Sequence, residues 1–238
     1  MGHAFGRGDG SRNSYTHLLS WRLVDDKSMN LVAMAEVCIQ ISENDRISQS
    51  ERFEIIINLI ITGKGGQGII TASKTILQAA VNRGYRVRSA ETIGMSQRGG
   101  SVSSHVRIGK EIDSPFISLG QADEIIALDR LEALRFKKYM KRGGHIYTAV
   151  YEKDREKKDG ESDSVLDINL TYACEKLGTR KMSNIIMLGM IFSRNNYPIS
   201  IKDIEEVILK YYPSDSGQKN VQALYMGQAL MEKMRYEG

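Results

Sequence analysis

The chain contains few cysteines, and this scarcity excludes several kinds of site. Only Cys38 and Cys174 occur among its 238 residues, and no C-x-x-C pair is present. An iron–sulfur cluster or a structural zinc site needs about four protein ligands, so this chain alone should hold neither. Two unpaired, distant cysteines are typical of the reducing cytosol, where disulfides are rare. We therefore predict a cytoplasmic protein with no metal site of its own.

The sequence also lacks an excess of charge of one sign and a long apolar run. The 33 Lys and Arg residues are nearly balanced by 29 Asp and Glu residues, which leaves a formal net charge of +4. Nucleic-acid binding requires basic residues gathered on one face, so this scattered composition predicts no nucleic-acid partner. No apolar stretch approaches the roughly 20 residues that span a bilayer, so no membrane segment is expected.

Residues 1–50 differ from the remainder of the chain. Their first part, MGHAFGRGDGSRNSYTH, is polar and glycine-rich and has no hydrophobic period. We interpret residues 1–50 as an N-terminal extension, mostly disordered or arising from a misassigned start codon, with a short helix near residues 29–40. Residues 51–238 are predicted to form the folded domain.

From residue 54 onward the sequence has the pattern of an α/β protein. EIIINLIIT (54–62) is a continuous apolar run, as expected for a strand buried on both faces. Apolar residues at helical spacing follow in 69–84, and YRVRSAE (85–91) has the composition of a second strand. Strand, turn, helix and strand make a βαβ unit, whose crossover connection makes the two strands parallel.

The later segments extend this architecture. Four more elements are predicted before residue 151: a half-polar strand at 101–109, a buried strand at 123–129, a helix over 130–144 that ends at two glycines, and a strand at 145–150. Residues 152–164 should form a charged surface loop. The segment beyond them should be mostly helical, with a capping box at Ser200 and Asp203. The predicted fold is a Rossmann-like, mainly parallel sheet with flanking helices and a helical C-terminal part.

The most informative motif is GKGGQG, which lies between the first strand and the first helix. Gly63, Gly65 and Gly68 have the G-x-G-x-x-G spacing of a dinucleotide-binding turn. Glycines allow a sharp reversal and leave backbone N–H groups open to a ligand or partner, beside a helix N-terminus that favours anions. The candidate binding residues here are Gly63, Gly65, Gly66, Gln67 and Gly68.

A second glycine-bearing segment, TIGMSQRGG (92–100), follows the second strand. In a doubly wound fold this loop leaves the same carboxyl edge of the sheet as GKGGQG, so we expect the two segments to converge. An arginine at such an edge can bind a phosphate or a carboxylate bidentately. The candidates from this region are Gln97, Arg98, Gly99 and Gly100 in the loop, with His105 and Arg107 supporting the loop from the following strand.

The residues alone leave other interpretations open. A nicotinamide or flavin Rossmann enzyme needs an acid at the end of the second strand to bind the ribose hydroxyls, and Glu91 lies there. Alternatively, the turn binds nothing and the chain is a purely structural subunit. A P-loop is excluded, because no Gly-Lys-Ser/Thr closes the turn.

Taken together, the two motifs resemble a known family. GKGGQGIITASKTILQAA, YRVRSAETIGMSQRGGSVSSHVRIG and QADEIIALDRLEAL are similar to the gamma-type domain of 2-oxoacid:ferredoxin oxidoreductases, over roughly residues 54–238. Within that family, the segment AETIGMSQRGGSVSSHVRIG looks most like the beta subunits of indolepyruvate ferredoxin oxidoreductases.

The resemblance implies a heteromeric enzyme. An alpha subunit would carry thiamine diphosphate and 4Fe-4S clusters, and the complex would oxidatively decarboxylate an aryl 2-oxoacid such as indolepyruvate. Coenzyme A would accept the acyl group and ferredoxin the electrons. This chain would bind no cofactor alone and supply no catalytic residue. Its glycine turn and Arg98 loop would form a wall of the shared site, against coenzyme A phosphates or the alpha subunit, with Gln67 and Arg98 orienting polar groups.

Overall fold

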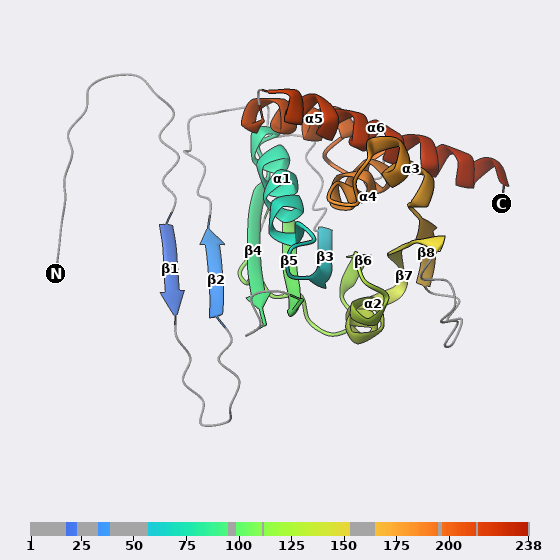
Figure 1. Ribbon diagram of the computed structural model, residues 1–238. Coiled ribbons are helices and arrows are strands. Elements are labelled where there is room, and N and C mark those ends of the chain that lie inside the picture. The colour runs from blue at the N-terminus through green and yellow to red at the C-terminus, as the bar shows by residue number, and fades with distance from the viewer. Residues whose placement is uncertain are drawn as a thin grey trace, which may run out of the picture.

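A computed structural model describes residues 18–22, 33–38, 57–94, 99–110, 112–152, 165–194, 197–212 and 214–237. An eight-stranded sheet with the order β1-β2-β4-β5-β3-β6-β7-β8 runs through the molecule (Figure 1). Its strands are β1 (Leu18–Arg22), β2 (Ala33–Cys38), β3 (Ile57–Lys64), β4 (Arg86–Ile93), β5 (Ser101–Gly109), β6 (Ala122–Ala127), β7 (Met140–Val150) and β8 (Val165–Asn169).

The helices are divided unequally between the two faces of this sheet. They are α1 (Ile69–Asn82), α2 (Arg130–Phe136), α3 (Thr171–Leu177), α4 (Ser183–Phe192), α5 (Ile201–Tyr211) and α6 (Asp215–Glu237), with a 3-10 turn η1 (Lys137–Tyr139) after α2. Side chains of α1 and of α3 to α6 share one large core with one face of the sheet. Helix α2 contributes Ala133 to a smaller core on the other face. In Figure 1, α2 accordingly lies apart from the group formed by the other helices.

The predicted mainly parallel sheet is confirmed. β3, β6, β7 and β8 pair in parallel, and β5 is antiparallel to both β3 and β4. Strands β3 and β4 therefore run in the same direction, as a βαβ unit requires. They are not neighbours, however, because β5 folds back from β4 and occupies the position between them.

The N-terminal segment contributes two strands. β1 pairs with β2, and β2 pairs antiparallel with β4 in the register Ala33↔Ile93 to Cys38↔Arg88. The helix expected near residues 29–40 is therefore wrong over 33–38. An unpaired strand edge such as that of β4 offers a row of hydrogen-bonding groups, and pairing with it overrides local helical propensity. Residues 1–17, 23–32 and 39–56 lie outside the described part of the chain, and the domain boundary at residue 50 stays a prediction.

Strand β5 has one polar face, as predicted, and that face is covered rather than exposed. Ser103 and His105, on the face opposite α1, are buried. The segment 112–120 covers this face, and the Ile117 N–H donates a hydrogen bond to His105 Nδ1 at 3.1 Å. The alternation of polar and apolar residues therefore marks a covered polar face rather than a solvated one.

The boundary between α2 and β7 also differs from the prediction. The helix ends at Phe136, and Gly143 and Gly144 lie inside β7 instead of ending the helix. The register between β6 and β7 shifts here, because Ala122 pairs with Met140 but Glu124 with His145. Gly143 has a φ of 81°, and a Cβ on Gly144 would lie 2.8 Å from the backbone oxygen of Asp123. The glycines thus serve a strand bulge, which local sequence patterns did not reveal.

The helical C-terminal part is confirmed, although it follows strand β8, which was not predicted. The capping box at the start of α5 is present as expected. The Asp203 N–H donates to Ser200 Oγ at 3.4 Å, and the Ser200 N–H donates to Asp203 Oδ2 at 2.6 Å. Arg83, just after α1, forms an ion pair with Asp203 at 3.3 Å, so the cap also connects α5 to α1.

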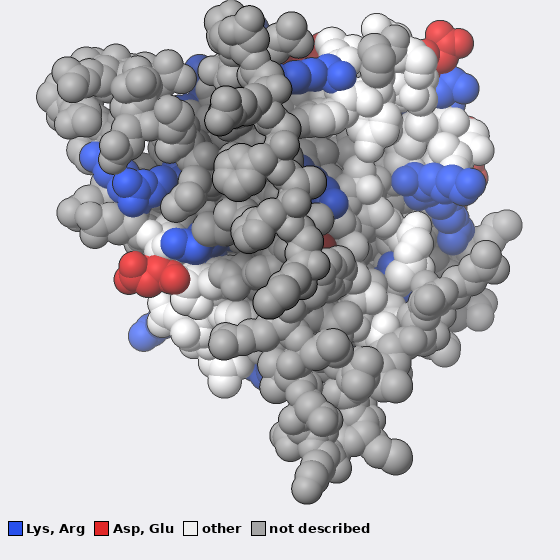
Figure 2. Space-filling view, turned by 90° about the vertical axis from the view of Figure 1, so that its left-hand side faces the viewer, with Lys and Arg blue, Asp and Glu red and all other residues white. Residues whose placement is uncertain are grey.

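Two features of the structure relate to the nucleic-acid and membrane partners that the sequence did not predict. Figure 2 shows the side of the molecule that lies on the left in Figure 1, with Lys and Arg side chains visible at several places among the described residues. No helix within the described ranges is long and apolar enough to cross a membrane. The part of residues 152–164 beyond Glu152, predicted to be a charged loop, lies outside the described residues.

Helices α4 and α6 cross with their backbones in contact. Every residue of α4 is buried. A Cβ on Gly189 of α4 would lie 1.8 Å from the Leu224 backbone oxygen, and a Cβ on Gly227 of α6 would lie 1.9 Å from the Ile186 oxygen. Only glycine permits this approach at either position.

We therefore expect Gly189→Ala to lower the free energy of unfolding by about 1–3 kcal/mol or more, because one added carbon must separate the two helices. The matched control is Ala229→Ser, which also adds one atom to this helix pair but at an exposed position of α6. Urea unfolding followed by circular dichroism measures both variants. Equal stability of Gly189→Ala and the wild type would contradict the close crossing.

Candidate functional site

The glycine turn connects β3 to α1 by a sharp reversal. Gly66 and Gly68 have φ values of 95° and 78°, in the left-handed region that favours glycine. Gly68 is the residue that precedes α1, and its carbonyl accepts a hydrogen bond from the Ala72 N–H at 3.0 Å. A Cβ on Gly66 would have no atom within 4 Å, so the turn is open at this point.

The two glycine motifs meet at the carboxyl edge of the sheet, as predicted. The Gly65 N–H donates a hydrogen bond to the Gly100 carbonyl at 2.8 Å. Next to this bond, Lys64 pairs with Ser101 across β3 and β5. Gly99, with a φ of 74°, has open space where a Cβ would lie. Gln97 and Arg98 lie outside the described residues, so their placement at this edge stays a prediction.

Gln67 has a role that the sequence did not suggest. Its Oε1 accepts a hydrogen bond from the Lys64 N–H at 2.6 Å, and its Nε2 donates to the Leu128 carbonyl at 2.9 Å. The amide therefore closes the turn and ties it to the end of β6, instead of orienting a ligand as expected. Gly63 makes room for it, because a Cβ there would lie 2.6 Å from Gln67 Oε1.

Charged residues outside the predicted set also border the turn. Lys64 Nζ forms an ion pair with Asp129 Oδ2 at 2.7 Å. Asp129 follows β6 and accepts a hydrogen bond from the Leu131 N–H, which caps α2. Buried Glu132 accepts a hydrogen bond from Ser101 Oγ at 2.6 Å. Lys64 lies within the GKGGQG motif and Asp129 ends a predicted strand, so position alone could have suggested both.

Asn184 brings a second helix N-terminus to the turn. It lies in the first turn of α4, and its Nδ2 donates to the Gly68 carbonyl at 3.1 Å. A Cβ on Gly68 would lie 2.4 Å from that Nδ2. Neither α1 nor α4 has an acidic residue in its first turn or a side-chain cap. Two helix N-termini therefore lend partial positive charge to this edge, which favours an anionic group.

Glu91 lies beneath α1 rather than at the rim. The carboxyl group is 4 % exposed and accepts a hydrogen bond from Ser73 Oγ at 3.4 Å. Burial raises the pKa of Glu91 above its usual value, and nearby Lys74 opposes this shift. A ribose ligand needs an accessible carboxylate, so this placement weakens the dinucleotide interpretation.

His105 and Arg107 support a different segment from the one expected. His105 accepts a hydrogen bond from Ile117, and Arg107 donates to Asn58 Oδ1 at 2.9 Å and to the Ser114 carbonyl at 2.8 Å. Both side chains therefore brace the segment 112–120. The Arg98 loop leads into β5 at Ser101, and six residues of strand, roughly 20 Å, separate that end of β5 from Arg107. Burial lowers the pKa of His105 from 6.5 to about 4, which keeps the ring neutral at pH 7.

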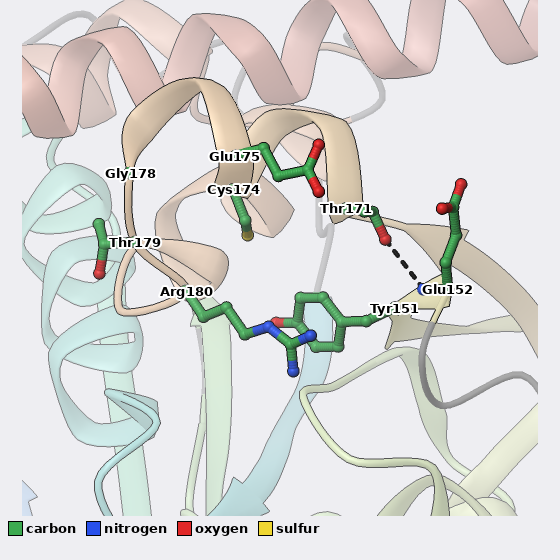
Figure 3. A pocket seen from close by; sticks show the side chains of 8 residues that line it. All are labelled: Tyr151, Glu152, Thr171, Cys174, Glu175, Gly178, Thr179 and Arg180. Atoms are coloured by element: carbon green, nitrogen blue, oxygen red, sulfur yellow. Dashed lines mark hydrogen bonds between the residues drawn. The ribbon is translucent and has the colours of Figure 1, made fainter.

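A cavity of about 440 Å³ lies on the far side of the α4 N-terminus (Figure 3). It is lined by Tyr151, Glu152, Thr171, Cys174, Glu175, Gly178, Thr179 and Arg180. The Arg180 guanidinium stacks 4.0 Å from the centre of the Tyr151 ring, and the Tyr151 and Ser183 hydroxyls are 2.7 Å apart. Ser183 directly precedes Asn184, so the residues that contact the cavity wall and the glycine turn are neighbours in the first turn of α4. No motif marks these residues, and sequence analysis missed the cavity.

Comparison with known proteins identifies the family. Residues 58–230 match the family model described as pyruvate ferredoxin/flavodoxin oxidoreductase. The chain belongs to this family. The match begins in β3 and includes both glycine motifs, so the resemblance noted from the sequence is confirmed.

Curated relatives narrow the assignment to one type of subunit. The chain is 35 % identical to the indolepyruvate oxidoreductase subunit IorB of Archaeoglobus fulgidus over 72 % of its own length and 93 % of the relative. The IorB subunit of Pyrococcus horikoshii is 32 % identical over 74 % of this chain and 96 % of its own. A 2-oxoglutarate synthase subunit KorC from Methanothermobacter marburgensis is 28 % identical over 72 % and 94 %. The chain is thus a gamma- or IorB-type subunit of 2-oxoacid oxidoreductases and part of an oxidoreductase complex.

Solved structures support the fold. The gamma subunit of a keto/oxoacid ferredoxin oxidoreductase from Geobacter sulfurreducens matches 74 % of this chain and 99 % of its own length, with a TM-score of 0.60 and 22 % identity. A 2-oxoglutarate:ferredoxin oxidoreductase from Magnetococcus marinus, with 2-oxoglutarate, coenzyme A and succinyl-CoA bound, matches 77 % of this chain at a TM-score of 0.63 and 19 % identity. This chain corresponds to 32 % of that longer chain.

The lowered pKa of His105 predicts a loss of stability in acid. Below pH 6.5 the unfolded chain binds a proton at this position while the folded chain does not, so unfolding becomes more favourable as pH falls toward 4. From pH 7 to pH 5 this effect is about 2 kcal/mol. His105→Gln keeps a hydrogen-bond acceptor for Ile117 and should remove that part of the pH dependence. Urea unfolding at both pH values tests it, and an undiminished pH dependence in His105→Gln would contradict it.

The bonds of Gln67 predict a structural effect of its removal. Gln67→Ala leaves the Lys64 N–H and the Leu128 carbonyl without these partners and should lower the free energy of unfolding by about 2 kcal/mol or more. Gln78→Ala removes an amide of α1 whose hydrogen bonds, to Asn82 and from Tyr211, are exposed to solvent, and should cost under about 0.5 kcal/mol. Equal effects of the two changes on thermal unfolding would argue against the closing role of Gln67.

Proposed function

We propose that this chain is the beta subunit of an indolepyruvate ferredoxin oxidoreductase. The complex would decarboxylate an aryl 2-oxoacid oxidatively, with coenzyme A as acyl acceptor and ferredoxin as electron acceptor, in the cytoplasm. One observation carries the substrate choice: four IorB subunits are 30–35 % identical to this chain, against 27–29 % for pyruvate, 2-oxoglutarate and ketoisovalerate relatives. That margin favours an aryl 2-oxoacid.

The division of labour follows from what this chain can supply. Its two cysteines are too few for an iron–sulfur cluster, so thiamine diphosphate and the 4Fe-4S clusters would reside on the alpha subunit. Gln67 does not titrate and its amide is engaged within the fold, and His105 is buried with its Nδ1 accepting a hydrogen bond from the Ile117 N–H. We assign this chain a binding role at the shared site, with no proton transfer and no nucleophilic attack.

The carboxyl edge is the part that would face coenzyme A. Two helix N-termini converge there, and the exposed side of the turn at Gly66 has no side chain. Phosphate groups carry the negative charge that such an edge attracts. Arg98, which follows β4 by a few residues, would complete the site as a bidentate phosphate ligand. Coenzyme A is bound in the solved Magnetococcus marinus relative, which supports this choice of anion.

Two other functions remain for comparison. A free-standing NAD- or FAD-dependent enzyme would need an accessible ribose ligand, and the burial of Glu91 argues against it. Tight binding of NAD by the purified chain alone would revive it. A purely structural subunit would share the fold and the partner, and only an effect of the turn or the Arg98 loop on catalysis separates it from our proposal.

The test is Arg98→Ala in the assembled complex, prepared without oxygen. Loss of a charge-assisted hydrogen bond costs about 1.5–3 kcal/mol, so the Michaelis constant for coenzyme A should rise roughly 10- to 100-fold. The control, Arg86→Ala, removes an exposed arginine from the opposite end of β4 and should leave it unchanged. If Arg98→Ala changes neither the Michaelis constant for coenzyme A nor the turnover, the chain is a purely structural subunit. Absence of any cluster-bearing partner would refute the complex itself.

A further inference from the structure

The face of the sheet that carries α2 is thinly covered. In the described part of the chain, five helices pack on the opposite face, whereas this face has only α2, η1 and the segment 112–120. The strands β3, β6, β7 and β8 pair in parallel, and parallel strands are normally covered on both faces of the sheet. The thin layer therefore marks a side of the domain on which an external partner can complete the cover.

The outer surface of this layer is apolar. Leu131 and Leu134 are one turn apart on α2 and are 68 % and 41 % exposed. Phe116 and Leu119 of the neighbouring segment are 43 % and 61 % exposed. We call these four residues the α2 patch. Single exposed apolar residues are ordinary, but a group of large ones on neighbouring elements is typical of an interface.

The elements of the α2 patch are held together by direct contacts. The Gly120 N–H donates a hydrogen bond to the Lys138 carbonyl at 3.1 Å. The His105 ring lies between the segment and the helix, 6.0 Å from the Phe116 ring and 6.5 Å from the Phe136 ring. The two elements of the α2 patch, helix α2 and the segment 112–120, are thus connected by direct contacts and do not lie independently of each other.

Positive charge borders the α2 patch. The exposed basic residues are Arg135, Lys137, Lys138, Lys141 and Arg142. Between Arg130 and Arg142 the only acidic residue is Glu132, which is buried and pairs with Arg135. Lys141 pairs with Asp123, and Asp113 in the segment 112–120 is exposed, so five exposed basic residues of these elements stand against one exposed acidic residue.

We propose that the α2 patch docks the larger, thiamine-binding subunit of the complex, through an apolar surface bordered by Asp and Glu; this inference rests on the proposed function. Charge decides against a second copy of this chain. A symmetric dimer would place the patch against itself and bring the same basic border into opposition, and like charges across an interface cost several kcal/mol. A partner with an acidic border gains from the same groups.

The position of α2 brings a partner that docks on the α2 patch close to the glycine turn. Its cap Asp129 holds Lys64, and its Glu132 holds Ser101, so the helix is fixed to both strands that carry the glycine motifs. A subunit seated on the α2 patch therefore lies next to the open turn at Gly66. The carboxyl edge would then form one wall of a cleft whose other wall is the partner.

The experiment uses the full chain and the thiamine-diphosphate-binding large subunit from the same source, co-expressed and purified without oxygen. The double variant Leu131→Ser/Leu134→Ser should weaken the dissociation constant, measured by interferometry, at least 10-fold. Leu209→Ser makes the same change at a 37 % exposed position of α5 and should leave it unchanged. Hydrogen exchange in the wild-type complex should slow in residues 130–139 but not in α5.

A charge variant tests the border separately. Lys138→Glu should lower the association rate several-fold at low salt and weaken its salt dependence, because attraction to an acidic border is lost. All changes are at exposed positions, and unchanged melting temperatures would show that the variants fold.

Three results would overturn the proposal. Wild-type affinity of the double variant, with no exchange protection over 130–139, would refute the docking surface while catalysis by the wild-type complex upheld the proposed function. A homodimer of the chain that the double variant dissociates would assign the patch to a second copy. Failure of the wild-type chain to bind the large subunit at all would refute the surface and the proposed function together.

Discussion

The hydrogen bond from the Gly65 N–H to the Gly100 carbonyl is the contact on which the candidate site depends. It exists because β5 returns antiparallel between β3 and β4, which brings the end of the second glycine motif beside the first. In a simple βαβ unit with adjacent parallel strands, the 92–100 loop would share this edge but would not be joined to the turn by strand pairing. The inserted strand thus converts two separate loops into one continuous edge.

The glycines at this edge serve different physical needs, although they share one spacing. Gly63 is small so that the Gln67 amide can fit, and Gly68 is small so that Asn184 can reach its carbonyl. Of these three glycines, Gly66 alone opens onto free space. The G-x-G-x-x-G pattern therefore reports mostly on packing between strand, turn and helix. Exposed backbone, the part relevant to a ligand or a partner, is confined to a short stretch.

Local sequence patterns predicted the elements whose determinants are local. The apolar run of β3, the helical spacing of α1 and the Ser200 capping box all agree with the structure. The errors depend on contacts between distant residues. β5 lies between β3 and β4, and the bulge at Gly143 answers a register shift against β6. Likewise, the Gln67 amide binds the Leu128 carbonyl, 61 positions away, which no motif could indicate.

Helix α4 explains how a rigid site and a thinly covered face coexist in one domain. Asn184 at its first turn holds Gly68, and Arg194 just beyond its last turn pairs with buried Glu124 of β6 at 3.2 Å. Burial raises the pKa of Glu124, and the neighbouring Arg194 guanidinium opposes that shift. Removing either partner of this ion pair would leave the other charge buried and unpaired, which would destabilise the fold. The α4 side therefore fixes Gly68 of the glycine turn, while Asp129 and Glu132 at the start of α2 hold Lys64 and Ser101. The α2 side contributes little to the large core, and so its outer surface is available to a partner.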